Sequence, residues 1–129
     1  MKAISVRQPW AWALFHGKPV ENRSWKTDYR GELLIHASKK FDYDGYLWLL
    51  KPAQNGLVKE WIPLPNGYRT GCIIGKVTMT DCVISHPSPW FFGPYGHIYK
   101  NQIEFKNTIP FRGALKFFDV PDELIKGAL

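Results

Sequence analysis

Three charged side chains at short spacing, Lys18, Glu21 and Arg23, are the strongest candidates for chemistry in this chain. A lysine supplies a point charge or a proton donor, a glutamate a general base, and an arginine a planar clamp for a phosphate or a base. A carboxylate withdrawn from water beside a lysine shifts the pKa of both groups, as acid–base chemistry requires. Lys18 and Glu21 are therefore the predicted catalytic pair, although a solvated ion pair would show the same spacing.

Aromatic and polar residues near this triad extend the predicted site. Bases stack on exposed aromatic rings, so tryptophans beside cations favour a nucleotide ligand. A satisfied, half-buried imidazole is the alternative at position 36, and a solvated turn the alternative at position 39. The expected ligand contacts are Arg7, Gln8, Trp10, Asn22, Arg23, Trp25, Tyr29, Arg30, His36 and Lys39.

The positive charge of the chain is concentrated in the same region. The formal net charge is +6 over 129 residues. Residues 1–40 hold eight lysines and arginines against three acids, whereas residues 41–129 hold nine against eight. A local excess of this kind indicates a surface on which an anion docks.

Hydrophobic periodicity predicts the elements that must position these residues. Alternation favours strands at Ala3–Arg7 and Pro19–Trp25, and the second strand would place Glu21, Arg23 and Trp25 on one face. Between them, a short helix from Trp10 to His16 would end at Gly17. A buried strand at Glu32–Ala37 follows.

The rest of the chain adds strands and short helices. Asp42 would cap a helix that runs to Leu50, with Tyr46, Leu49 and Leu50 as its apolar stripe. Residues 52–66 are expected to be irregular, anchored by Trp61 and Ile62. The remaining predictions are a long strand over 69–85 with a bulge or a bend at Gly75, strands over 97–105 and 114–118, and a helix over 121–126.

Together these elements predict one domain over residues 1–129, of the α+β class. The architecture would be a small, partly open mixed β-barrel of five to six strands with short inserted helices. An apolar content of 45% and a charged content of 22% are typical of a globular protein.

Several function classes find no support in the sequence. No apolar run approaches the roughly 20 residues that span a bilayer, and no signal peptide is evident, so no membrane partner is expected. Cys72 and Cys82 lie too far apart on one extended strand to form a disulfide, which favours the cytoplasm. Neither a metal-ligand spacing nor a glycine-rich phosphate loop occurs, so no metal or cofactor is predicted. The oligomeric state is not defined by the sequence.

Several blocks in one order resemble the ASCH domain: Ile4–Ala11, His16–Lys18, Glu21–Trp25, Tyr29–Gly31, Leu34–Ser38, Ser88–Gly96 and Phe118–Pro121. The resemblance implies a PUA-like β-barrel with a cleft, related to domains that bind RNA and modified nucleosides. Members of that family are described as nucleic-acid-binding modules, as coactivator domains, in one case as a ribonuclease, and in small bacterial proteins as amidohydrolases that deacetylate N4-acetylcytidine.

The amidohydrolase motif of that family has a lysine followed three residues later by a nucleophilic threonine. Lys18 matches the lysine, but the threonine position is Glu21. Acyl transfer then lacks an evident nucleophile, although a glutamate could activate a water molecule.

Three functions follow from these observations. The first is binding of single-stranded or modified RNA in a basic aromatic cleft, with RNA cleavage by Lys18 and Glu21 as an accompanying activity. The second is hydrolysis of an N4-acetylcytidine-type nucleoside. The third is a non-catalytic interaction module that uses the aromatic loop 90–96 against another protein.

Overall fold

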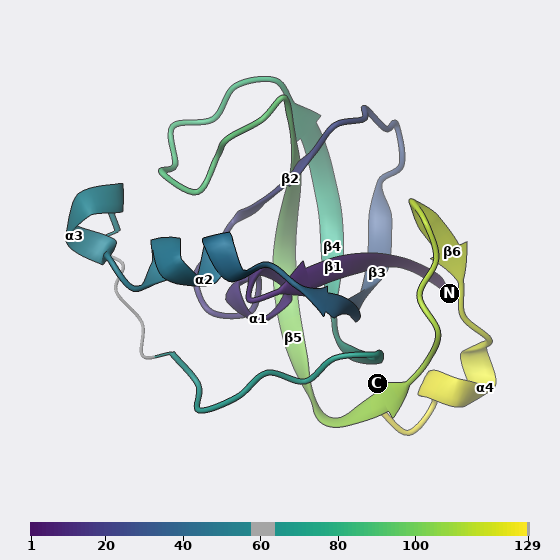
Figure 1. The fold of residues 1–129 in the computed structure, drawn as a ribbon. Coiled ribbons are helices and arrows are strands. Elements are labelled where there is room, and N and C mark those ends of the chain that lie inside the picture. The colour runs from purple at the N-terminus through teal and green to yellow at the C-terminus, as the bar shows by residue number, and fades with distance from the viewer. Residues whose placement is uncertain (58–63, 129) are drawn as a thin grey trace.

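A curved sheet of six strands forms the frame of the protein (Figure 1). The computed structural model describes residues 1–57 and 64–128, so the expected anchors Trp61 and Ile62 lie outside the described residues. The strands are β1 (Lys2–Gln8), β2 (Val20–Arg23), β3 (Gly31–Phe41), β4 (Cys72–Val83), β5 (Tyr95–Pro110) and β6 (Phe117–Asp119). Short helices connect them: α1 (Trp10–Ala13), α2 (Tyr43–Leu49), α3 (Pro52–Asn55) and α4 (Asp122–Ile125).

The strand order β2-β5-β4-β3-β1-β6 confirms the expected mixed α+β architecture. β1 and β3 pair in parallel, while the other neighbours pair antiparallel. The sheet curls without closing, as a partly open barrel does, and β2 and β6 are its edges. In Figure 1, α2 and α3 lie beyond the β2 side of the sheet, and the N-terminus lies beside β6 and α4.

The bulge expected at Gly75 is present in β4. The register of β4 slips between Ile73 and Gly75 against β5, and against β3 at the same point. A Cβ atom at Gly75 would meet the Phe15 ring and lie 2.6 Å from the Ile103 carbonyl oxygen. The bend therefore brings two strands and a core ring so close that only glycine fits.

The predicted cap of α2 is also confirmed, because the Asp42 carboxylate accepts a hydrogen bond of 3.0 Å from the Gly45 amide. Leu49 is buried as expected, but Leu50, the residue that follows the helix, is 49% exposed and does not complete the expected apolar stripe. The last strand begins at Phe117 rather than at residue 114. Lys116 has a left-handed φ of 56°, which interrupts the extended backbone there.

The core lies on both faces of the sheet. Ile4, Leu33 and Ile35 belong to one buried cluster, and Leu34 and Ile73 to another on the opposite face. The alternation of β3 thus buries both of its faces, which holds β1 and its neighbours rigidly in place. Cys72 and Cys82 are free thiols. Among the described residues, no helix has the length and apolar character needed to cross a membrane.

Candidate nucleic-acid interface

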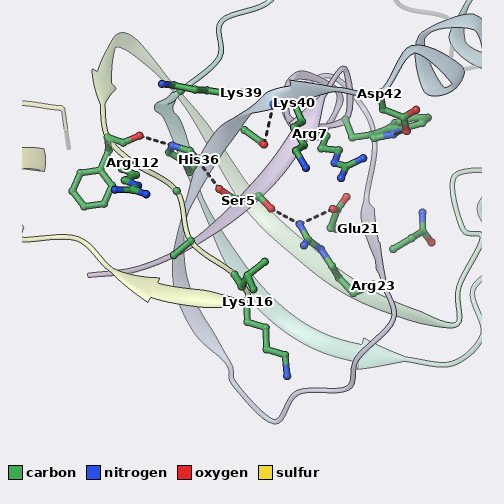
Figure 2. Close-up of a pocket in the computed structure, with 18 of the residues that line it drawn as sticks. Ser5, Arg7, Glu21, Arg23, His36, Lys39, Lys40, Asp42, Arg112 and Lys116 are labelled. Carbon is green, nitrogen blue, oxygen red and sulfur yellow. Dashed lines mark hydrogen bonds and ion pairs between the residues drawn. The ribbon is translucent and has the colours of Figure 1, made fainter.

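A cleft of about 1310 Å³ opens on the side of the sheet where β1, β2 and β3 meet the segment that joins β5 to β6 (Figure 2). That volume exceeds the roughly 300–1,000 Å³ typical of a pocket for one small ligand. Residues from five separate parts of the chain line it: Ser5, Arg7, Trp10, Glu21–Trp25, His36, Ser38–Lys40, Asp42, Gly71 and Phe111–Lys116.

Positive charge dominates the lining. The lining residues include six lysines and arginines but only two carboxylates, Glu21 and Asp42. In Figure 2, Arg7, Lys39 and Lys40 lie along one side of the cleft, and Lys116 lies on the other. A concave wall carrying one sign of charge concentrates the opposite charge, so the cleft favours an extended anion.

Glu21 lies between two cations at the floor of the cleft. Because side chains alternate along β2, Glu21 and Arg23 project from the same face. The Glu21 carboxylate contacts Lys18 Nζ at 2.8 Å through one oxygen and Arg23 Nη2 at 3.0 Å through the other. Arg23 Nη2 also donates a hydrogen bond of 2.6 Å to the Ser5 carbonyl, which ties β2 to β1.

The electrostatics of this triad fix the charge of Glu21. Burial alone would raise the pKa of Glu21, but Lys18 and Arg23 outweigh burial and hold the pKa below its ordinary value. Glu21 is therefore ionised at neutral pH. A carboxylate stabilised in this way is a weak base, because its affinity for a proton is low.

Lys18 is close to the cleft but is not part of its lining. Its side chain is 2% exposed, and its ammonium lies 5.1 Å from the centre of the Trp10 ring. The structure thus brings Lys18 to Glu21, as the spacing predicts, and covers it from solvent. A direct contact between Lys18 and a phosphate is not provided by this arrangement.

The two cleft tryptophans differ in how neighbouring side chains contact their rings. Trp10 donates a hydrogen bond of 2.7 Å to Asp42 and packs against Trp48 and Trp90. Burial would raise the pKa of Asp42, but hydrogen bonds from the Gly45 amide and the Trp10 indole lower it. Trp10 is therefore largely fixed in place by its neighbours.

Trp25 is partly buried beside the cleft, after the end of β2. His97 and Phe117 meet its ring edge to face, with centroids at 4.8 and 5.1 Å. Lys116 Nζ lies 5.8 Å from the ring centre. A flat ring held by neighbours and faced by an exposed lysine suits base stacking, because the base can take the position of the ammonium.

His36 is a satisfied imidazole, as the alternative reading of the sequence expected. It is 2% exposed, and its Nε2 lies 2.6 Å from the Phe111 carbonyl, which can only accept. Nε2 therefore carries the proton, and Nδ1 accepts from the Ser5 hydroxyl at 2.6 Å. Burial lowers the pKa of His36, although the bond to Phe111 partly opposes this effect.

The other expected contacts divide into two groups. Arg7 and Lys39 are exposed and line the cleft, whereas Gln8, Tyr29 and Arg30 do not line it. Gln8 is buried, where its side chain accepts a hydrogen bond from the Trp12 amide and donates one to the Arg69 carbonyl. The Tyr29 hydroxyl donates a hydrogen bond to the Glu32 carbonyl. Arg30 forms an ion pair with Asp81 at 3.5 Å.

Asn22 lies on the cleft, but its side chain serves the fold. Its amide donates to the Trp90 carbonyl at 3.0 Å, and its oxygen accepts from the Phe92 and Gly93 amides at 2.8 and 3.0 Å. These three bonds hold the aromatic loop against β2. The Asn22 side chain is thereby committed to the loop.

Sequence reasoning missed the far wall of the cleft, residues 111–116. Arg112 and Lys116 were counted within an evenly charged half of the chain, and residues 114–118 were read as a strand. A glycine close to two cations in the sequence indicates a basic loop, and this segment has Arg112, Gly113 and Lys116. Ser5 and Ser38 carried no such signal. Among the described residues, no group of three or more His, Cys, Asp or Glu is placed to hold a metal ion.

Comparison with known proteins matches most of the chain to one family of domains. The family model of the ASCH domain matches residues 4–113. Activating signal cointegrator 1 of Homo sapiens is 33% identical over 137 aligned positions, which cover 97% of this chain, and the Mus musculus protein is 31% identical over the same share. The chain spans 23% of the length of these relatives.

Proposed function

This chain belongs to the ASCH domain family, and on that premise we propose that it is an RNA-binding domain over residues 1–129 that holds a single strand in the cleft. The observation that carries the proposal is the cleft lining, where six lysines and arginines stand beside Trp25 and Trp10. Cations that follow a sugar–phosphate backbone and rings that stack on bases are the two elements of single-strand recognition.

The size of the cleft favours a polymer over a free nucleoside. A volume of about 1310 Å³ accommodates more than one nucleotide. The cations also come from four separate segments, so no single phosphate can reach all of them. Ser24 and Ser38 add hydroxyl groups to the lining, which can bond the ribose 2′-hydroxyl that separates RNA from DNA.

Hydrolysis is the second candidate function, and the contact between Lys18 and Glu21 at 2.8 Å favours it. Either cleavage of RNA or deacetylation of N4-acetylcytidine would need Glu21 to accept a proton. Because Lys18 and Arg23 hold the pKa of Glu21 low, that transfer would be slow. Binding without rapid turnover is the function that the geometry supports better.

A protein-interaction role through loop 90–96 has less support. Trp90 is 1% exposed and Phe92 is 61% exposed, so the loop offers one protruding ring rather than a continuous apolar patch. The relatives' name, activating signal cointegrator, is consistent with either kind of partner. A cytoplasmic location stays a prediction from the sequence.

Fluorescence anisotropy with a labelled single-stranded RNA tests the proposal. We expect binding that weakens with salt, and the same length of DNA should bind less tightly. Lys39→Ala should lower the slope of log K against log salt by about 0.7, because one phosphate contact is lost from a single strand. Lys106→Ala is the matched control, since Lys106 is exposed but lies outside the cleft.

Two results would contradict the proposal. One is an equal change of slope in both variants, which would place binding outside the cleft. The other is the absence of binding to any RNA at low salt. Product analysis of the same RNA, and of N4-acetylcytidine, decides separately whether hydrolysis accompanies binding.

A further inference from the structure

Residues 112–116 form an arm that overhangs the cleft between β5 and β6. Both ends of the arm are fixed. At one end, the Phe111 amide donates to the Gly71 carbonyl at 3.2 Å, and the Phe111 carbonyl accepts from His36. At the other end, Phe117 and Phe118 pair with β1. A loop held at both ends presents its side chains in a defined place, which lowers the entropic cost of binding.

The arm passes directly over the bonded pair of Ser5 and His36. A Cβ atom at Gly113 would collide with the Ser5 hydroxyl and approach His36 Cε1 to 2.7 Å. Glycine is therefore required here for close approach. The side chains of Ser5 and His36 therefore lie directly against the backbone of the arm at Gly113.

Leu115, two residues before β6, is more exposed than any other large apolar side chain among the described residues. It is 93% exposed, and it lines the cleft between Arg112 and Lys116. The next residue, Lys116, holds a left-handed φ of 56°, which is strained for a side chain with a Cβ atom. Exposed apolar surface and backbone strain together at one point of a cleft are features of a binding element.

The position of Lys116 shows where the arm reaches. Its ammonium lies 5.8 Å from the centre of the Trp25 ring, on the opposite wall. A base that stacks on Trp25 would therefore lie next to the arm. Arg112 and Lys116 would then meet the phosphates on either side of that base.

We propose that Leu115 is a wedge that packs against the bases of the strand in the cleft, with Arg112 and Lys116 on the flanking phosphates. This inference rests on the proposed function and deepens it, because it specifies unpaired, accessible bases as the ligand. Apolar side chains inserted at base steps unstack them, at a cost of a few kcal/mol per step in a duplex. A strand whose bases are already free avoids that cost.

The experiment compares two ligands by fluorescence anisotropy with the full chain. One is a labelled single-stranded RNA, and the other is a strand of the same length built of abasic spacers, which keeps the phosphates and lacks the bases. Leu115→Ala should weaken binding of the RNA roughly tenfold, by loss of apolar contact, and leave binding of the abasic strand unchanged. Leu115→Met keeps the apolar contact and should bind both strands as the unmodified protein does.

Matched variants separate the wedge from other effects. Leu124→Ala removes a leucine that is 47% exposed in α4 and lies outside the cleft, so it should change neither affinity. Arg112→Ala should weaken binding of both strands, because it removes a phosphate contact. Circular dichroism should show that Leu115→Ala folds normally, since the side chain packs against little of the protein.

The outcomes are distinct. Equal affinity of Leu115→Ala and the unmodified protein for the RNA, or an equal loss on both strands, would overturn the wedge while leaving RNA binding in place. If the unmodified protein binds neither strand, the proposed function itself fails.

Discussion

Replacing Glu21 with glutamine should destabilise the fold far more than an ordinary loss of one ion pair. The side chains of Glu21 and Lys18 are only 8% and 2% exposed. Glutamine keeps the shape of the side chain but removes the negative charge that Lys18 and Arg23 share. The ammonium of Lys18 would then be buried with no counter-charge from Glu21.

The expected loss is about 3–5 kcal/mol in the free energy of unfolding, as found when one partner of a buried pair is removed. That is a large fraction of the 5–15 kcal/mol that stabilises a typical domain. The matched control is Glu32→Gln, because Glu32 also pairs with a lysine, Lys76, at 3.0 Å but is 61% exposed. An exposed pair contributes about 0–1 kcal/mol, so the control should change little.

Urea denaturation followed by circular dichroism measures both variants, first at pH 7. The pKa of Glu21 in the folded protein lies below its ordinary value of 4.5, so the folded state binds fewer protons than the unfolded chain in that range. The stability that Glu21 contributes is present above pH 4.5 and is lost as pH falls through the lowered pKa. The difference between Glu21→Gln and the unmodified protein should therefore narrow in acid.

A double variant checks the cause of the loss. Lys18→Met combined with Glu21→Gln removes the uncompensated charge, so it should recover a large part of the stability lost in Glu21→Gln alone. A loss below about 1 kcal/mol in Glu21→Gln, equal to that of Glu32→Gln, would refute the reasoning. So would a difference that stays constant with pH.

Three further outcomes follow from the geometry. Burial lowers the pKa of His36 and of His97, so the unfolded chain binds more protons than the folded protein below pH 6.5. Urea titrations should therefore show that the free energy of unfolding falls as pH drops below 6.5. A free energy of unfolding that does not change with pH in that range would contradict this prediction. Gly75→Ala should cost about 1–3 kcal/mol in the same assay, while Gly67→Ala, with no atom within 4 Å of the added Cβ, should be neutral. Gly113→Ala should displace the 112–116 arm and weaken RNA binding in anisotropy titrations, and unchanged affinity would show that the arm is not used.

The sequence predicts the parts of the fold that depend on local chemistry. The cap at Asp42 and the bulge at Gly75 were both predictable, because each follows from what one residue type permits in the backbone. The shared face of Glu21 and Arg23 follows from strand alternation, and their contact is present at 3.0 Å.

The depth and the far wall of the site depend on long-range packing. Nothing near Lys18 in the sequence shows that its side chain is 2% exposed, because its burial depends on Trp10 and on the strands packed around it. Arg112 and Lys116 reach the cleft because long-range contacts hold that segment, among them the hydrogen bond from His36 to Phe111, 75 residues later in the chain. Contacts of this span leave no periodic signal in the sequence.

The indole region of a proton–nitrogen NMR spectrum tests the central claim most directly. The chain has six tryptophans, whose signals can be assigned with single Trp→Phe variants. Titration with single-stranded RNA should shift the Trp25 indole signal, because that ring lies on the cleft, and leave the Trp12 signal in place, because that side chain lies outside the cleft. A shift at Trp12 with none at Trp25 would contradict the account, since the RNA would then bind elsewhere on the protein.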